Sequence, residues 1–332
     1  MNEKAIDVFG VGNAIVDTLA FVDSDFLRER NFKPGIMTLV DSNQQAELLH
    51  DLKKVKLELR SGGSAANTMI GIARCGGNGF YSSKVSGDTN GEFYRKDLLD
   101  SGLHFDVHPL PEEHGPTGTC VVLTTPDTER TMFTHLGVST ELNDHDIDEE
   151  RLKKCKFSYI EGYLWTGEAT KRAAKRTMEL SKKNGIPAAF TFSDPWLVGM
   201  AKDDFKNLIT DYCSIVFCNA EEAKIFTGND NIKENAEIIG EFVDQVYITN
   251  GSSGCVVNDN GKIFDVSGFK VNAVDTNGAG DAFAGGVLYG LSRGAPAEKA
   301  AKCGNYLASC IVQIPGARIE DDHSNKITEF LK

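Results

Sequence analysis

Residues 274–283, VDTNGAGDAF, combine a run of small residues with a carboxylate. Apolar residues recur at helical spacing after Gly278, Ala279 and Gly280, so a helix is expected to begin near Ala279. The first N–H groups of a helix lack intrahelical partners and lie at the positive end of its dipole, so small residues there let a phosphate approach the backbone. Asp281 would lie beside that anion site and could accept a proton from an attacking hydroxyl. The alternative is an ordinary helix start, where Asp is also favoured.

Two other stretches carry groups that could bind a ligand. In residues 60–67, RSGGSAAN, Gly62 and Gly63 let a ligand approach the backbone, and Asn67 follows with a donor and an acceptor. The alternative for this stretch is a closely packed helix start. Asp17 follows the first predicted strand, and ligands of α/β proteins bind at the carboxyl ends of strands. The alternative for Asp17 is a surface turn.

Several other chemistries lose support from the sequence. Gly10 and Gly12 begin a dinucleotide-binding fingerprint, but Ile15 occupies its third glycine position, which disfavours a nicotinamide-dependent dehydrogenase. The chain has no GxxxxGK[ST] motif, so it is not a Walker-type phosphate-binding protein. His104 and His108 are four residues apart, but the chain has no HExxH motif and Pro109 would end a helix there, so surface histidines are the favoured interpretation.

The composition is that of an ordinary globular protein. The 332 residues carry a net charge of −13, which argues against a nucleic-acid-binding surface, since that would need a basic stripe. No apolar segment is long enough to cross a membrane, and no signal peptide is recognisable. The eight cysteines are scattered and are interpreted as structural thiols. We therefore expect a cytoplasmic protein with a small-molecule substrate.

Apolar runs alternate with helical segments along most of the chain. This alternation predicts an α/β fold with a doubly wound, mostly parallel sheet. The expected strands are residues 5–11, 157–160, 188–192, 215–218, 245–249 and 269–274, the last directly before the glycine run. The expected helices are residues 26–32, 43–52, 64–75, 167–184, 200–209, 220–226 and 234–242.

One region departs from this alternation of strands and helices. Residues 104–136 are rich in β-type residues around the turn at Pro126, which predicts a hairpin. Together with residues 13–23 and 36–42, this hairpin is expected to form a small β-sheet that protrudes from the core. A projecting sheet next to a phosphate loop is interpreted as a lid.

The glycine-rich stretches together resemble the two signatures of the ribokinase-like, or PfkB, family of sugar and nucleoside kinases. Residues 275–281, DTNGAGD, carry the more specific signature. The likeness continues through further positions from residue 10 to about residue 316: Gly12, Asn13 and Asp17, then Asn219 and Glu222 as an NxxE motif, then Thr249, Gly251 and Gly254. It implies one ribokinase-like kinase domain over residues 1–332, with a three-layer core and a β lid.

The resemblance also implies a role for each of these positions. Asp281 would be the base, and Gly278, Ala279 and Gly280 would hold the transferred phosphoryl group. The acceptor would be bound by Asp17, Gly62, Gly63 and Asn67. Asn219 and Glu222 would organise Mg²⁺, and ATP would lie beside Thr249, Gly251, Gly254 and the helix of Asn305. Arg130 would close on phosphate or sugar. A monovalent cation such as K⁺ would lie near Asp275 and residues 314–316.

The acceptor is the least constrained element of this hypothesis. Asn277 within DTNGAGD is the variant associated with adenosine kinases, and Phe21, Tyr163 and Trp165 could stack on a purine or pack in the core. Residues 61–67, by contrast, are more similar to bacterial sugar kinases. The favoured acceptor is adenosine at its 5′-hydroxyl, with ribose or fructose as the alternative.

Two further expectations follow from the resemblance. A non-catalytic sugar- or nucleotide-binding protein is disfavoured, because a protein that only binds needs neither Asp281 nor the NxxE motif. Homodimer formation through the lid is possible in this family, which also contains monomers.

Overall fold

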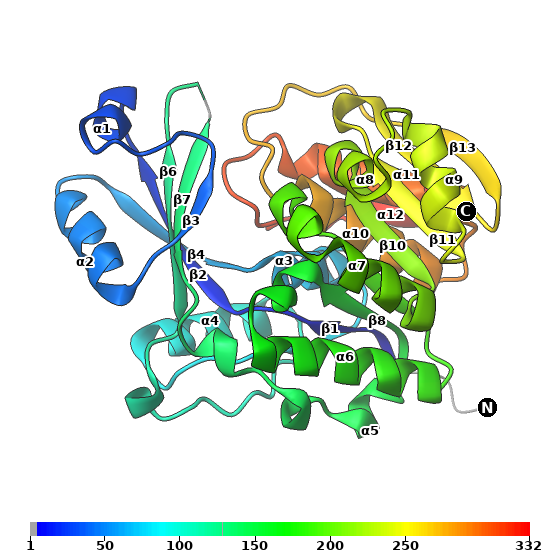
Figure 1. The fold of residues 1–332 in the computed structure, drawn as a ribbon, viewed down its shortest axis with the longest axis horizontal. Helices are drawn as coiled ribbons and strands as arrows, with labels where there is room; N and C mark the ends of the chain where they lie inside the picture. The colour runs from blue at the N-terminus through cyan, green and yellow to red at the C-terminus, as the bar shows by residue number, and fades with distance from the viewer. Residues whose placement is uncertain (1–4, 128) are drawn as a thin grey trace.

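A computed structural model provides the structure of the chain and describes residues 5–127 and 129–332. Its strands form a large sheet in the order β13-β12-β11-β10-β9-β8-β1-β5 and a small sheet in the order β3-β7-β6-β2-β4. Figure 1 shows the small sheet standing beside the large one, which has helices on both faces. The predicted α/β core with a small protruding sheet is therefore confirmed.

The large sheet is parallel from β5 to β11, whereas β12 pairs antiparallel with both β11 and β13. Its strands are β1 (Ile6–Val11), β5 (Gly79–Ser82), β8 (Cys155–Glu161), β9 (Ala188–Thr191), β10 (Ile215–Asn219), β11 (Gln245–Thr249), β12 (Gly254–Asp259) and β13 (Lys262–Ser267). Because the parallel strands share one direction, the segments that follow β1, β8, β9, β10 and β11 emerge at the same edge.

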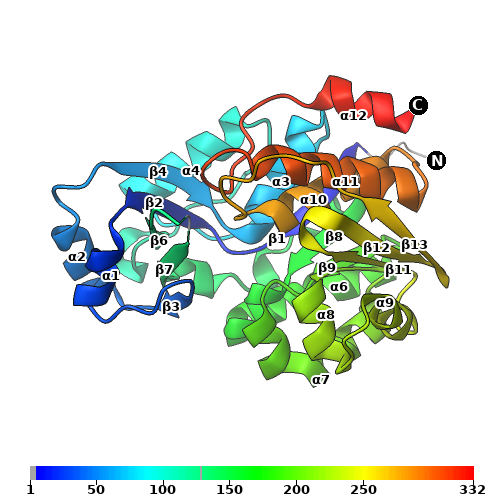
Figure 2. The ribbon, with the colours of Figure 1, turned by 90° about the horizontal axis from the view of Figure 1, so that it is seen from above.

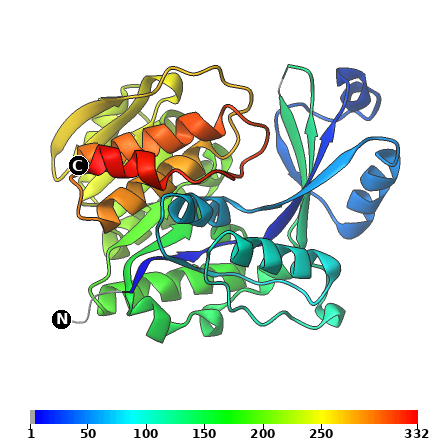
Figure 3. The ribbon, with the colours of Figure 1, turned by 180° about the vertical axis from the view of Figure 1, so that it is seen from behind.

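Helices cover the two faces of the large sheet around separate apolar clusters. One face carries α3 (Ser64–Arg74), α4 (Thr89–Asp100), α10 (Ala279–Ser292), α11 (Ala297–Ile311) and α12 (Ser324–Leu331). The other carries α5 (Glu149–Leu152), α6 (Glu168–Lys183), α7 (Pro195–Tyr212), α8 (Ala220–Thr227) and α9 (Ile232–Gly240). Figure 2 shows these two layers above and below the sheet, and Figure 3 shows α12 on the outside of the core, far from the small sheet.

The small sheet consists of strands that come from four separate parts of the chain. They are β2 (Ile15–Phe21), β3 (Met37–Leu39), β4 (Leu57–Gly62), β6 (Gly118–Thr124) and β7 (Arg130–His135). Helices α1 (Ser24–Glu29) and α2 (Ser42–Asp51) cover one face, where they bury a cluster that includes Leu48 and Phe133. Short 3-10 turns lie at Glu112–His114, Gly137–Glu141, Asp144–Asp146, Gly162–Thr166 and Gly251–Ser253.

The structure corrects the predicted extent of the lid in two places. Strand β4 belongs to the small sheet although the sequence did not predict it, because its alternation of Leu57 and Leu59 with charged residues also fits an exposed loop. Residues 104–117 do not belong to that sheet. His104 pairs with Phe80, and Leu110 pairs with Ser86, so this segment runs beside the core.

The strand predicted at residues 269–274 is absent, and this segment is irregular. Phe269 packs against Tyr306 and Phe330, on helices α11 and α12. Val274 and Asp275 both donate their N–H groups to the carbonyl oxygen of Val312. Only Phe269 of this alternating pattern packs on the core, while Val271 and Val274 are exposed, so a loop precedes the glycine run.

Candidate active site

Helix α10 begins at the glycine run, as the sequence predicts. Its N-cap is Gly278, whose φ of 73° lies in the left-handed region. A Cβ atom at this position would lie 2.8 Å from Ala317, so the tight turn leaves no room for a side chain. Asp281 lies in the first turn of the helix. The local sequence therefore places an acid beside unpaired N–H groups.

Two side chains of α3 hold the Asp281 carboxylate. The Ser64 hydroxyl donates to Oδ1 at 2.7 Å, and the Asn67 amide donates to Oδ2 at 3.1 Å. Burial raises the pKa of Asp281 to about 6, although these two hydrogen bonds act in the opposite direction. The carboxylate is therefore ionised at neutral pH and has a fixed orientation.

Asn67 has a second polar atom that the protein leaves unused. The side chain is 8% exposed, and its Oδ1 atom is buried without a hydrogen-bond partner. A buried acceptor without a donor costs about 1–3 kcal/mol. A ligand hydroxyl beside Asp281 would satisfy this atom.

Asp17 lies within β2 of the small sheet, and β2 pairs with β4. A Cβ atom at Gly62 would collide with the Asp17 carboxylate, so the glycine makes room for that side chain. Burial raises the pKa of Asp17 to about 7, and the charge of Asp281 adds to this rise, while Arg130 and Arg318 oppose it. The two carboxylates are thus close enough to influence each other.

Gly63 follows at the point where the chain returns from β4 to the core. Its φ is 95°, and a Cβ atom there would collide with the carbonyl oxygen of Asn13. Asp17, Gly62, Asn67 and Asp281 thus lie together at the junction of the two sheets. Both glycines are closely packed, and contact of their backbone with a ligand stays a prediction.

Arg130, on β7, reaches the loop before α10. Its guanidinium forms an ion pair with Asp275, while its Nε and Nη1 atoms are buried without partners. The Asp275 carboxylate also accepts hydrogen bonds from the N–H groups of Asn277 at 2.9 Å and Gly316 at 2.7 Å. Three donors therefore hold this carboxylate in place, and a monovalent cation near Asp275 and residues 314–316 stays a prediction.

Asn219 and Glu222 form a capping box at the start of α8, which follows β10. Glu222 accepts from the Asn219 N–H at 3.0 Å and from its side-chain amide at 2.8 Å, while its own N–H donates to the Asn219 side chain at 2.8 Å. Glu222 is 5% exposed, and burial raises its pKa to about 7. In the described part of the chain no three His, Cys, Asp or Glu side chains gather to hold a metal. One carboxylate fits Mg²⁺, which usually binds through one or two carboxylates, phosphates and water.

The residues expected beside ATP follow β11, at the same edge of the large sheet as Asn219 and Glu222. Thr249 ends β11, and Gly251 and Gly254 flank the turn into β12. Asn305 is buried on α11, where its amide donates to the carbonyl oxygens of Val266 at 2.9 Å and Ser267 at 3.2 Å. Asn305 therefore holds the end of β13, and any effect on a nucleotide would act through that strand.

The three aromatic residues that were candidates for base stacking have different environments in the structure. Trp165 is 7% exposed, packs edge-on against Phe205 and donates to Asp204 at 2.8 Å. Its prediction as a substrate-binding residue is thus corrected to core packing, because helix α7 covers the ring. Burial raises the pKa of Tyr163, and the charges of Asp194 and Asp281 add to this rise.

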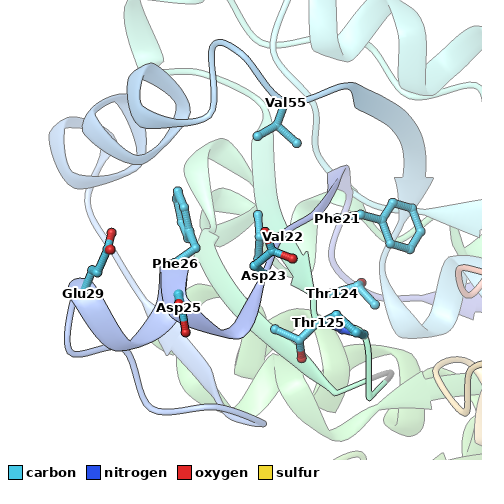
Figure 4. A pocket seen from close by; sticks show the side chains of 10 residues that line it. Phe21, Val22, Asp23, Asp25, Phe26, Glu29, Val55, Thr124 and Thr125 are labelled. Atoms are coloured by element: carbon cyan, nitrogen blue, oxygen red, sulfur yellow. The ribbon is translucent and has the colours of Figure 1, made fainter.

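Phe21 is 57% exposed and lies on β2 four residues after Asp17, so both side chains are on the same face of the strand. Figure 4 shows the Phe21 ring pointing away from Phe26. A hollow of about 490 Å³ lies at this outer end of the small sheet, lined by Phe21, Val22, Asp23, Asp25, Phe26, Glu29, Val55, Thr124, Thr125 and Pro126. The Asp17 face thus continues into an exposed aromatic ring.

Sequence reasoning missed three residues of this region. Ser64 lies three residues before Asn67, so helical periodicity could have placed both on one face. Arg318 is buried and donates to the carbonyl oxygen of Ser61 at 3.2 Å, and it forms an ion pair with Asp97. Glu161 is buried at the end of β8. No motif in the sequence points to Arg318 or Glu161.

Comparisons with known proteins found a matching family and similar solved structures. Residues 35–323 match the family described as pfkB family carbohydrate kinase. The chain is 27% identical to adenosine kinase 2 of Arabidopsis thaliana, over 93% of this chain and 94% of that protein. The solved structure of adenosine kinase from Sinorhizobium meliloti is 32% identical, with a TM-score of 0.91 over 98% of this chain and 99% of that one. A probable sugar kinase from Rhizobium etli is 31% identical, with a TM-score of 0.92 and 98% of both chains covered. No helix in the described residues is both long and apolar enough for a membrane span.

Proposed function

Because the chain belongs to the pfkB family of carbohydrate kinases and is an ATP-dependent kinase, we propose that it phosphorylates the 5′-hydroxyl of adenosine or a closely related purine nucleoside. The observation that carries this proposal is the Asp281 carboxylate, held by Ser64 and Asn67 in the first turn of α10. We take residues 1–332 as one kinase domain with a small-molecule acceptor.

The chemistry is an in-line phosphoryl transfer. Asp281 accepts the proton of the acceptor hydroxyl while that oxygen forms a bond to the γ-phosphorus. The bond from the γ-phosphorus to the β-phosphate oxygen breaks, and ADP leaves. A base with a pKa of about 6 is ionised at neutral pH and still basic enough to take the proton.

The developing negative charge is stabilised by the start of α10. No atom lies within 4 Å of a Cβ built at Gly280, in the first turn of α10, which leaves open space for a phosphoryl group beside the N–H groups of that turn. The unpaired N–H groups of Arg130 would add charge-assisted hydrogen bonds. Mg²⁺, organised by Asn219 and Glu222, would neutralise the phosphates of ATP.

Asp17 would hold the hydroxyls of the acceptor sugar. Its pKa is about 7 because of burial, and hydroxyl donors would stabilise the ionised form. Gly62 and Gly63 would shape the same pocket, because a Cβ atom at either position would collide with Asp17 or with the Asn13 carbonyl. The unpaired Asn67 Oδ1 would accept from another hydroxyl of the acceptor, since the proton of the reacting hydroxyl goes to Asp281. These contacts suit a ribose ring in either a nucleoside or a free sugar.

A purine base as part of the acceptor is supported by the apolar side chains that lie beside Asp17 on the same face of the small sheet. The Asp17 face of the small sheet carries an apolar cluster that contains Leu19, Cys120 and Val122, and the exposed Phe21 ring lies at its end. A base stacked on an aromatic ring gains about 1–3 kcal/mol. Relatives named adenosine kinase add support for this acceptor.

The second candidate acceptor is a monosaccharide such as ribose or fructose. The likeness to a probable sugar kinase from Rhizobium etli favours it, and the contacts at Asp17 and Asn67 do not need a base. Under this alternative, the apolar face beyond Asp17 would play no part in acceptor binding.

Competition between acceptors tests the proposal. The enzyme is given Mg-ATP with equal concentrations of adenosine and one sugar, and the phosphorylated products are quantified by mass spectrometry. Adenosine should be used about 10- to 100-fold more efficiently than ribose, since 1.4 kcal/mol corresponds to a factor of ten. A dominant ribose or hexose phosphate would establish the sugar kinase instead.

A further inference from the structure

Glu161 is a buried carboxylate that the phosphoryl-transfer chemistry leaves unused. It ends β8 at the edge of the large sheet where the site lies, and it is 1% exposed. Its Oε1 atom accepts from the Asn13 backbone N–H at 2.7 Å and from the Asn13 side-chain amide at 2.8 Å. Its Oε2 atom accepts from the backbone N–H of Ala65 at 2.8 Å.

These donors lie on two segments that connect the large sheet to the small one. The chain leaves the core after β1 and enters β2 through Asn13, and it returns from β4 to α3 just before Ala65. We call these two connecting segments, at Asn13 and at residues 62–65, the crossings. Each carboxylate oxygen of Glu161 thus accepts hydrogen bonds from one crossing. The carbonyl groups of the same crossings are held by buried tyrosines, since Tyr81 donates to Asn13 at 2.8 Å and Tyr94 donates to Gly62 at 3.1 Å.

The surroundings are shaped to admit this carboxylate. A Cβ atom at Gly12 would lie 2.6 Å from the Oε2 atom of Glu161 and 2.6 Å from the Cβ atom of Ala65, so the glycine provides the space. The Ala65 N–H lies in the first turn of α3, where it has no intrahelical partner and where negative charge is favoured. Glu161 therefore acts as a buried cap for α3 as well as a link to Asn13.

Both crossings lead directly to residues of the candidate site. Asn13 precedes Asp17 by four residues on the segment that enters the small sheet. Ala65 lies between Ser64 and Asn67, the two side chains that hold Asp281. A shift of either crossing would change the distance between the acceptor-binding carboxylate and the base.

We propose that Glu161 is a positioning residue for phosphoryl transfer, which holds both crossings and so fixes Asp17 of the small sheet relative to Asp281 of the core. This inference rests on the roles proposed above for those two residues. Glu161 itself touches neither substrate, and it acts through Asn13 and Ala65.

The Glu161→Gln substitution tests this role with little change in shape. One end of the amide would still accept from its neighbour, but the other end would place an N–H₂ group against a backbone or side-chain donor, so one crossing loses its hydrogen bond. A misplacement of about 1 Å costs roughly 100-fold in rate. We expect kcat to fall at least about 10-fold and KM for the acceptor to rise, while the affinity for ATP, measured by calorimetry, stays unchanged.

Asp7→Asn serves as the matched control. Asp7 is also buried on β1, but at the opposite end, where it accepts from the Asn78 N–H at 2.8 Å and pairs with Lys156 at 2.9 Å. This variant should lose folding stability while kcat and the acceptor KM are retained. Hydrogen exchange should accelerate in peptides covering residues 10–20 and 62–70 for Glu161→Gln but not for Asp7→Asn.

Two outcomes would overturn the role of Glu161. The first is a Glu161→Gln enzyme with lowered melting temperature but wild-type kcat and acceptor KM. The second outcome concerns Asn13→Ala, which serves as the test if Glu161→Gln does not fold. Asn13→Ala removes only the side-chain hydrogen bond to Glu161, and wild-type kinetics in that variant would count against the proposal. Asp281→Asn, assayed in parallel, separates the two proposals. If Asp281→Asn loses turnover while Glu161→Gln keeps wild-type kinetics, only the role of Glu161 fails. If Asp281→Asn retains full turnover, the proposed base fails, and the role of Glu161 fails with it.

Discussion

Replacing Asp281 with Asn should abolish most turnover while leaving the site intact. The amide has the same shape as the carboxylate, and its oxygen can accept from the Asn67 amide while its N–H₂ group donates to the Ser64 hydroxyl. Both hydrogen bonds, at 3.1 Å and 2.7 Å in the wild type, can therefore persist with the serine proton reversed. The change removes the proton acceptor and one negative charge, and little else.

The size of the effect follows from the role of the group. A positioned general base contributes about 10²–10⁴-fold in rate, or about 3–5 kcal/mol of barrier. We expect kcat to fall by that factor. The affinity for ATP should stay equal or rise slightly, because a negative charge near the γ-phosphate has been removed.

The pH dependence of kcat in the wild-type enzyme should report the titration of Asp281. Burial raises the pKa of Asp281 to about 6, so the base is protonated and inactive below that value. The turnover number kcat should rise with pH, approach a plateau above about pH 7, and show no such limb in Asp281→Asn.

Turnover is measured by coupled ADP release, ATP binding by calorimetry, and folding by circular dichroism. A folded, ATP-binding Asp281→Asn enzyme that keeps more than about a tenth of wild-type kcat would refute the assignment of the base, since the loss would lie far below the usual range.

Four further results are expected. Asp17→Ala should raise the acceptor KM by about 30- to 1,000-fold, from a loss of about 2–4 kcal/mol in charged hydrogen bonds, and an increase in the ATP KM instead would place Asp17 outside the acceptor site. Acceptor binding at pH 7 should release protons, because hydroxyl donors lower the pKa of Asp17 from about 7, and calorimetry in two buffers with different ionisation enthalpies would detect it. Glu222→Gln should shift the Mg²⁺ dependence of kcat to higher concentration, and an unchanged titration would leave Glu222 only its capping role. Phe21→Ala should lower kcat/KM for adenosine but not for ribose, whereas Trp165→Ala should lower the melting temperature with little effect on acceptor choice; equal losses for both acceptors in Phe21→Ala would exclude stacking there.

The large sheet and its helices could be predicted because each element has a strong local pattern. The apolar run at residues 245–249 matches β11 residue for residue, and α3 begins at Ser64 as expected. Strand β4 could not be predicted in this way. Its alternating charged residues are explained by pairing with β2, which is distant in the chain. The local pattern alone therefore does not distinguish this strand from an exposed loop.

The same distinction applies to the candidate site. Asp281 and Asn67 lie in glycine-rich stretches whose backbone requirements are visible locally. Trp165 was misassigned because an aromatic residue after a strand gives the same pattern whether its ring faces a ligand or the interior. Glu161 has partners 148 and 96 residues away in the chain, so no spacing in the sequence connects it with Asn13 or Ala65.

The division of the molecule into two sheets has a consequence for how its selectivity could change. Asp17 and Phe21 belong to the small sheet, whereas Asp281 belongs to a core helix. Under the proposed function, substitutions around Asp17 and Phe21 can change the surface that contacts the acceptor without altering Asp281 or the start of α10, where the phosphoryl group is transferred. Recognition and reaction are then separable traits, open to independent redesign, and the crossings held by Glu161 are where a single change would alter both.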